Sequence, residues 1–180
     1  MDIPHQWTCT CCGKTYTGLP LDCGFLFPDY YLDWKSGLSA EEVKQRCLVN
    51  EDICVIDETF YFVRGVIELP VLGFANDSFR WGVWVSLSEK SFKEMMDLWD
   101  VDPAGHGPYF GWLNTEITFY NKPTSSLKTN VHLRKNNQRP SIELEPTSHP
   151  LALEQRHGIT IERIQEIAMA LLHKSPEAQS

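Results

Sequence analysis

The centre of the chain contains two runs of aromatic and β-branched residues, TFYFVRGVIEL at residues 59–69 and FRWGVWVSL at residues 79–87. Both runs have the length and composition of β-strands. In the second run, Trp84 points to one face and four large residues point to the other, namely Phe79, Trp81, Val83 and Val85. A strand with large apolar residues on both faces is usually covered on both sides. We therefore predict a central strand here, in which Gly82 marks a bulge or a close approach of two backbones.

Further strands and helices are expected on both sides of these runs. The first strand, residues 53–57, forms a hairpin with residues 59–69 through a turn at Glu58, and the other expected strands are residues 109–113, 127–133 and 141–144. Four helices are expected, at residues 40–49, 89–99, 151–157 and 161–173. This order predicts an α+β fold, with an antiparallel-rich central sheet flanked by helices and an N-terminal cysteine knuckle.

A chain of 180 residues, 42% of them hydrophobic, fits one folded domain with room for a small appendage. We expect a cysteine-containing N-terminal loop region at residues 1–27, an α+β core domain at 28–174 and a disordered tail at 175–180. No signal peptide or membrane-spanning run is recognisable in the sequence. The expected location is therefore the cytoplasm, where the six cysteines would be reduced.

The stretch WTCTCCG, residues 7–13, contains a CxxC pair formed by Cys9 and Cys12. Two thiolates at this spacing can chelate one zinc ion, and Gly13 fits the tight turn that follows such a pair. A structural zinc site needs four ligands, so we add Cys23 as a third candidate ligand and His5 as a fourth. The alternative is that these small thiols pack without metal. A redox pair is disfavoured because KTYTGLP cannot begin a helix that would lower a thiol pKa.

Charge argues against nucleic acid as a partner. The formal net charge is −8, and the lysines and arginines are scattered rather than gathered in a stripe. The C-terminal helix–Gly–helix segment has the outline of a helix-turn-helix. Glu162 and Glu166 lie in the early turns of its second helix, however, and would face DNA phosphates. We expect an α-helical hairpin packed on the sheet.

Candidate ligand-binding residues come from the aromatic content and from one polar segment near the C-terminus. They are Trp84, Tyr109, Trp112, Glu145 and His149. Trp84 and Trp112 lie close to glycines and are expected to be partly exposed, where they could line a cleft or a binding surface. The alternative is structural: the aromatic residues pack between sheet and helices, and His149 caps a turn. The sequence contains no recognisable catalytic motif, so no catalytic residue is assigned.

These features favour a non-enzymatic protein-binding domain that neutralises or regulates a partner, for example a basic protein attracted by the acidic surface. One alternative is a small-molecule-binding protein or enzyme with an aromatic-lined cleft. Another is a metal-dependent structural or sensor protein that depends on the cysteines.

Several segments also carry a family likeness, among them WTCTCCG, DICVID, FYFVRGVIELPV, FRWGVWVSLSE, PYFGWL, LKTNVHLR, RPSIELEPTSHPLALEQRHGI and ERIQEIAMALLH. In these segments the chain resembles an uncharacterised bacterial family, domain of unknown function 2199. The resemblance implies a bacterial protein and supplies no activity. Tyr16 occupies a position where the family often has a histidine, so a family-type zinc site would lack that ligand here unless Cys11 or Cys23 replaces it.

Overall fold

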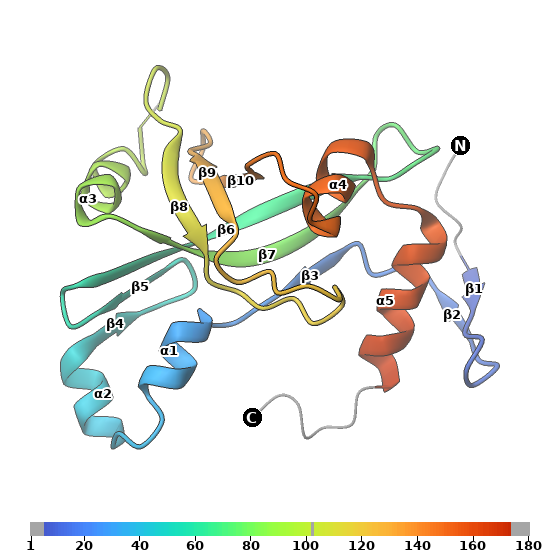
Figure 1. The fold of residues 1–180 in the computed structure, drawn as a ribbon, viewed down its shortest axis with the longest axis horizontal. Coiled ribbons are helices and arrows are strands. Elements are labelled where there is room, and N and C mark those ends of the chain that lie inside the picture. Colours follow the sequence, from blue (N-terminus) through green and yellow to red (C-terminus); the bar gives the residue numbers. More distant parts are fainter. Residues whose placement is uncertain (1–5, 102, 174–180) are drawn as a thin grey trace.

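The computed structural model describes residues 6–101 and 103–173. The strands in this part of the chain are β1 (Gln6–Thr8), β2 (Thr15–Thr17), β3 (Asp22–Gly24), β4 (Cys47–Val49), β5 (Ile53–Ile56), β6 (Phe60–Pro70), β7 (Ser78–Leu87), β8 (Tyr109–Leu113), β9 (Lys128–His132) and β10 (Ser141–Leu144). The helices are α1 (Asp29–Trp34), α2 (Ala40–Arg46), α3 (Glu89–Asp97), α4 (Pro150–His157) and α5 (Ile161–His173) (Figure 1).

Strands β6 to β10 form a closed five-stranded barrel. Each strand pairs antiparallel with the next, from β6 to β10, and β10 returns to pair with β6. In a run of five alternating strands, the first and last point the same way, so the closing pair must be parallel. This closing pair is short: Ser141 lies opposite Val66, and the Val66 amide donates to the Pro140 carbonyl at 2.9 Å.

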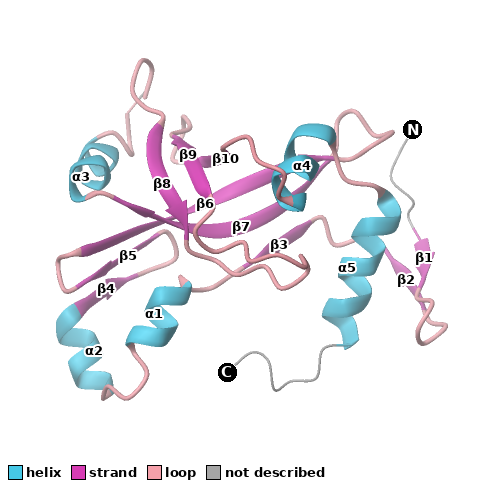
Figure 2. Cartoon of the chain, viewed as in Figure 1, coloured by secondary structure: helices cyan, strands magenta, loops and turns pink. Residues whose placement is uncertain are grey.

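Strands β6 and β7 extend beyond the barrel and carry the rest of the main sheet. Their mutual pairing runs from Tyr61 opposite Leu87 to Pro70 opposite Ser78. On its other edge, β6 pairs with β5 and then with β10, while β7 pairs with β3 and then with β8. Strand β4 continues the sheet beyond β5 (Figure 2). The two long strands therefore belong to both the barrel and the open sheet.

Apolar residues cover both faces of these long strands, as the sequence predicts. Trp81, Val83 and Val85 belong to the main core of the barrel. On the opposite face, Trp84 and Phe62 form a second cluster with Tyr31 of α1. The Asp57–Glu58 turn of the β5–β6 hairpin has φ values of 51° and 50°, which a type I′ turn requires. The predicted hairpin is thus confirmed.

The α+β class is confirmed, but a central sheet flanked by helices is an incomplete description, because five strands close into a barrel. Local sequence patterns do not encode the parallel pairing of β10 with β6. The helix expected at residues 40–49 ends at Arg46, and Cys47–Val49 is a strand. Ser39 and Glu42 form a capping box at the start of this helix. None of the helices in the described part of the chain has the length and apolar character needed to cross a bilayer.

The tight closure of the barrel predicts a large effect for Gly65→Ala. A Cβ atom at Gly65 would lie 2.5 Å from Ile142 Cδ1 and 2.9 Å from the Pro140 carbonyl oxygen. Because Ile142 is fully buried in the core, it has little room to move. We expect the free energy of unfolding to fall by about 1–3 kcal/mol, measured by urea denaturation.

Gly82→Ala is the matched control. A Cβ atom at Gly82 would meet no atom closer than 3.4 Å, which is ordinary van der Waals contact. This variant should therefore unfold near the wild-type midpoint. If Gly65→Ala also unfolds there, the β6–β10 seam is looser than the structure indicates.

Candidate functional site

The β1–β2 hairpin turns at the cysteine-rich stretch. Trp7 lies opposite Tyr16 in its register, and the two rings stack with centroids 5.2 Å apart. At the turn, the Cys9 amide donates to the Lys14 carbonyl at 2.8 Å, and the Gly13 amide donates to the Cys9 carbonyl at 2.9 Å. Gly13 has a φ of +71°, a conformation that glycine adopts without strain. The turn therefore presents closely spaced thiols at one end of the hairpin.

Two of these thiols meet a histidine from the last turn of α5. Cys9 Sγ lies 3.4 Å from Cys11 Sγ and 3.3 Å from His173 Nε2. The three potential ligand atoms all lie within 4.8 Å of one another. Zinc–sulfur and zinc–nitrogen bond lengths imply about 3.5–3.8 Å between ligand atoms of a tetrahedral site. The cluster is therefore compact enough to hold a metal ion with little rearrangement.

Hydrogen bonds at this cluster favour a thiolate at Cys9. Burial alone would raise the pKa of the Cys9 thiol, but hydrogen bonds from the Cys12 amide, from His173 and from Cys11 lower this pKa to about 6. The pKa of Cys11 is raised, chiefly because its thiol hydrogen-bonds to Cys9. The thiolate is the form that binds metals. Of Cys9 and Cys11, Cys9 is thus the residue that more readily supplies a thiolate.

The hairpin also packs on α5 through apolar and polar contacts. Trp7, Cys9 and Ala168 form a small buried cluster, with Met169 packed against it. The Thr10 hydroxyl lies 3.2 Å from the Met169 sulfur. Figure 1 shows the hairpin beside α5, at the opposite end of the molecule from α2. Segments 164 residues apart in sequence are therefore in contact at Cys9 and His173.

Of the predicted ligands Cys9, Cys12 and Cys23, the structure places only Cys9 in this group; Cys11, named above as a possible replacement, and His173 are its other members. The Cys12 thiol is exposed and lies 3.8 Å from the Tyr16 hydroxyl, outside the three-residue group. Cys23 lies in β3 opposite Trp81, where burial raises its thiol pKa to about 11. His5 lies outside the described residues. His173 could not be identified from local sequence, because only tertiary packing of α5 brings it to the hairpin.

The prediction that Trp84 is partly exposed is wrong, whereas the same prediction for Trp112 is confirmed. Trp84 is fully buried beneath the segment that leads into α1, and its indole N–H donates to the Phe25 carbonyl at 3.1 Å. Trp112 is 43% exposed on the outer face of β8, beside Phe110 at 45%. A nearby glycine in the sequence does not show which tryptophan is exposed, because the segment that covers Trp84 is distant from it in sequence.

The other predicted ligand-binding residues have structural contacts. The Tyr109 hydroxyl donates to Glu94 at 3.2 Å, and burial raises the pKa of this phenol to about 12. His149 Nδ1 accepts from the Leu151 amide and caps α4, as the structural alternative predicts. Glu145 is partly exposed, and its amide donates to the Lys128 carbonyl. The structure does not gather these residues with Trp84 and Trp112 into one aromatic-lined cleft.

The fold and the cluster define a small mixed α/β protein with a five-stranded barrel and a cysteine–histidine group that can hold a metal ion. The chain belongs to DUF2199, a family described as an uncharacterized protein conserved in bacteria, whose model matches residues 8–159. The match includes Cys9 and Cys11 and ends before α5, which supplies His173. Neither a curated protein nor a solved structure matches the chain.

The different environments of the two tryptophans lead to a stability test. Trp84→Ala removes a fully buried indole, so we expect the free energy of unfolding to fall by about 3–5 kcal/mol. Trp112→Ala removes a partly exposed side chain and should cost about 1 kcal/mol or less. Urea denaturation followed by circular dichroism measures both. Equal losses would contradict the burial difference between these positions.

Proposed function

We propose that the protein is a binding protein whose N-terminal hairpin and C-terminal helix are joined by a structural zinc ion. The observation that supports this most strongly is the convergence of Cys9, Cys11 and His173. Thiolates and imidazole are the ligand types that structural zinc prefers. The ion would link β1–β2 to α5, which are otherwise held together by a small apolar cluster and by the contact of Thr10 with Met169.

Cys12 is our proposed fourth ligand. A structural zinc site is normally closed by four protein ligands. Cys12 is adjacent to Cys11, and its charge contributes to the raised pKa of the Cys11 thiol, so the two groups lie close. The Cys12 thiol is exposed and its contact in the structure is a 3.8 Å approach to Tyr16. A side-chain rotation away from that weak contact would complete a tetrahedral set.

Elemental mass spectrometry tests the zinc proposal on protein purified without chelator or a nickel column. We expect close to one zinc per chain in the wild type and almost none in Cys9→Ser. His173→Ala should also lose the metal; because His173 is exposed, this change should leave the fold intact. Loss of zinc should lower the melting temperature, because binding to the folded state stabilises it.

Cys23→Ser is the control, since Cys23 lies outside the cluster and should keep wild-type zinc content. Cys12→Ser should weaken zinc binding if this thiol is the fourth ligand. Metal-free wild-type protein that also fails to take up added zinc would contradict the proposal. So would zinc retained at full content in His173→Ala.

A protein partner is the second part of the proposed function, and one surface feature supports it. Phe110 and Trp112 lie next to each other on the outer face of β8, with ring centroids 5.3 Å apart and edge-to-face geometry. The Lys128 ammonium lies 5.9 Å from the Trp112 ring. Exposed aromatic residues of this kind are enriched at the energetic centres of protein interfaces. The net charge of −8 suits a basic partner.

Affinity purification from native lysate tests this surface. We expect a basic protein to copurify in stoichiometric amount with the wild type and to be lost with Phe110→Ser/Trp112→Ser. Leu48→Ser is the matched control, because Leu48 is also exposed, at 61%, but lies on β4. Repeated absence of any stoichiometric partner, or equal recovery with both variants, would contradict the role of the aromatic pair.

A further inference from the structure

A hollow of about 690 Å³ lies on the outer face of β6 and β7, and none of its lining residues belongs to the cysteine–histidine cluster. Its lining comes from β3, β6 and β7, from the β4–β5 turn and from the loop between β9 and β10. The size is typical of small-molecule sites. Four of the charged side chains that line it are arginines, namely Arg64, Arg80, Arg134 and Arg139.

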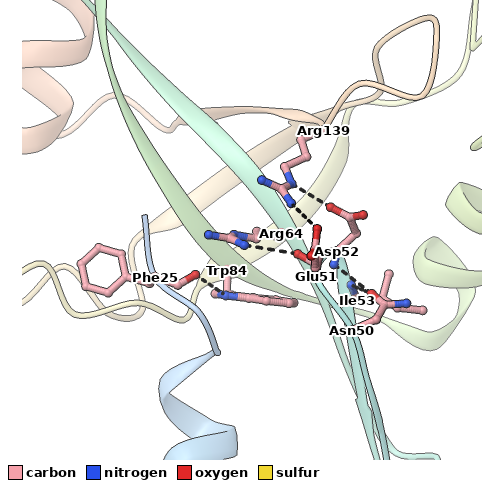
Figure 3. A network of polar contacts seen from close by, with 8 residues as sticks. All are labelled: Phe25, Asn50, Glu51, Asp52, Ile53, Arg64, Trp84 and Arg139. Carbon is pink, nitrogen blue, oxygen red and sulfur yellow. Dashed lines mark hydrogen bonds and ion pairs between the residues drawn. The ribbon is translucent and has the colours of Figure 1, made fainter. Parts of the chain in front are cut away.

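Three of these arginines already have carboxylate partners. The ion pairs are Arg80–Asp22 at 2.6 Å, Arg134–Glu68 at 3.0 Å and Arg139–Asp52 at 2.7 Å. Among the described residues, Arg64 forms no ion pair. Its Nη1 lies 3.5 Å from the Glu51 carbonyl oxygen, at the limit of a hydrogen bond, and its buried Nε has no partner (Figure 3).

Two glycines make room for the Arg64 side chain. A Cβ atom at Gly24 would lie 2.9 Å from Arg64 Nη2, and one at Gly82 would lie 3.8 Å from it. The guanidinium therefore lies against the backbones of β3 and β7, where side chains would otherwise cover it. Gly24 and Gly82 both line the hollow. The absence of side chains at these two positions leaves the cation uncovered.

The charge of Arg64 is incompletely compensated at this position. Partial burial lowers the pKa of its guanidinium, and the nearby charge of Arg139 lowers it further, while Asp52 and Glu51 act in the opposite direction. Arginine stays protonated in proteins, so the cost of burial remains until an anion approaches. A bound anion would relieve both the burial and the repulsion from Arg139.

We propose that this hollow binds a small organic monocarboxylate, with its carboxylate paired to the Arg64 guanidinium. The planar fork of arginine matches a carboxylate in geometry. Four arginines and three carboxylates line the hollow, so the lining itself carries one excess positive charge; the Glu51 carboxylate, which is highly exposed and lies 3.8 Å from Arg139, is not part of the lining. A dianion such as phosphate would bring a second negative charge close to Asp52 and Glu68. The volume accommodates an organic group beyond the carboxylate itself.

Titration with benzoate, followed by nuclear magnetic resonance, tests the proposal on the full chain. The amide signals of Gly24 and Gly82 should shift and saturate with benzoate. Sodium chloride at the same ionic strength should not reproduce this shift, and inorganic phosphate should bind more weakly. Absence of a saturable benzoate shift would overturn the proposal. Tighter binding of phosphate would overturn its assignment to carboxylates.

Substitutions separate the role of Arg64 from a general effect of charge. Arg64→Gln should weaken benzoate binding about tenfold or more, because it removes at least one charge-assisted hydrogen bond to the carboxylate. Arg80→Gln removes the same charge from a residue already paired with Asp22, and should change affinity by less than about threefold. Equal loss in both variants would overturn the specific role of Arg64.

Gly24→Ala tests the position of the Arg64 guanidinium without altering any charge. Its methyl group would displace the Arg64 guanidinium from the backbone of β3, so benzoate binding should weaken by about threefold or more. This variant decides the question if Arg64→Gln does not fold. Wild-type affinity in Gly24→Ala would overturn the proposed geometry.

Discussion

The antiparallel pairing of β6 with β7 is the interaction on which the rest of the molecule depends. It is the longest pairing in the described part of the chain, and each strand divides its other edge between two partners. Each half of this two-stranded ribbon carries one barrel strand and one strand of the open sheet: β8 and β5 flank the half at Tyr61–Val63 and Val85–Leu87, and β10 and β3 flank the half at Val66 and Arg80–Gly82. Because backbone hydrogen bonds must be satisfied along both edges, the short strands β3, β8 and β10 have few alternative positions.

The outer face of this ribbon changes from apolar to charged along its length. Phe62 and Trp84 are buried under α1, while Glu68 and Arg80 face the hollow. Arg64 lies directly opposite Trp84 in the β6–β7 register and marks the boundary between the two regions. The same covering segment, which contains Phe25, buries Trp84 and leaves Arg64 at the edge of the hollow. Packing of the second core therefore fixes where the uncompensated charge lies.

Local patterns were sufficient to predict most elements, because strands β6 and β7 are rich in aromatic and β-branched residues and helices carry local start and stop signals, such as the capping box at Ser39 in α2 and Pro150 and Gly158 at the ends of α4. Long-range relations were not predictable in this way. Nothing in SIEL indicates that β10 closes a barrel against β6, and nothing near His173 indicates a metal ligand. At Gly82 the β6–β7 register is continuous, without a bulge, and a Cβ atom there would make ordinary van der Waals contact with the Gly24 Cα of the paired strand β3.

The two candidate sites have different physical origins but share one structural connection. The cysteine cluster depends on contacts between the two ends of the chain, whereas the arginine-lined hollow depends on the central ribbon. Leu19 packs against both the barrel core and the small cluster at α5. It lies just before β3, which supplies Asp22 and Gly24 to the hollow. Because β3 pairs with β7 over three residues, restraint of the preceding hairpin helps to hold this wall of the hollow in register.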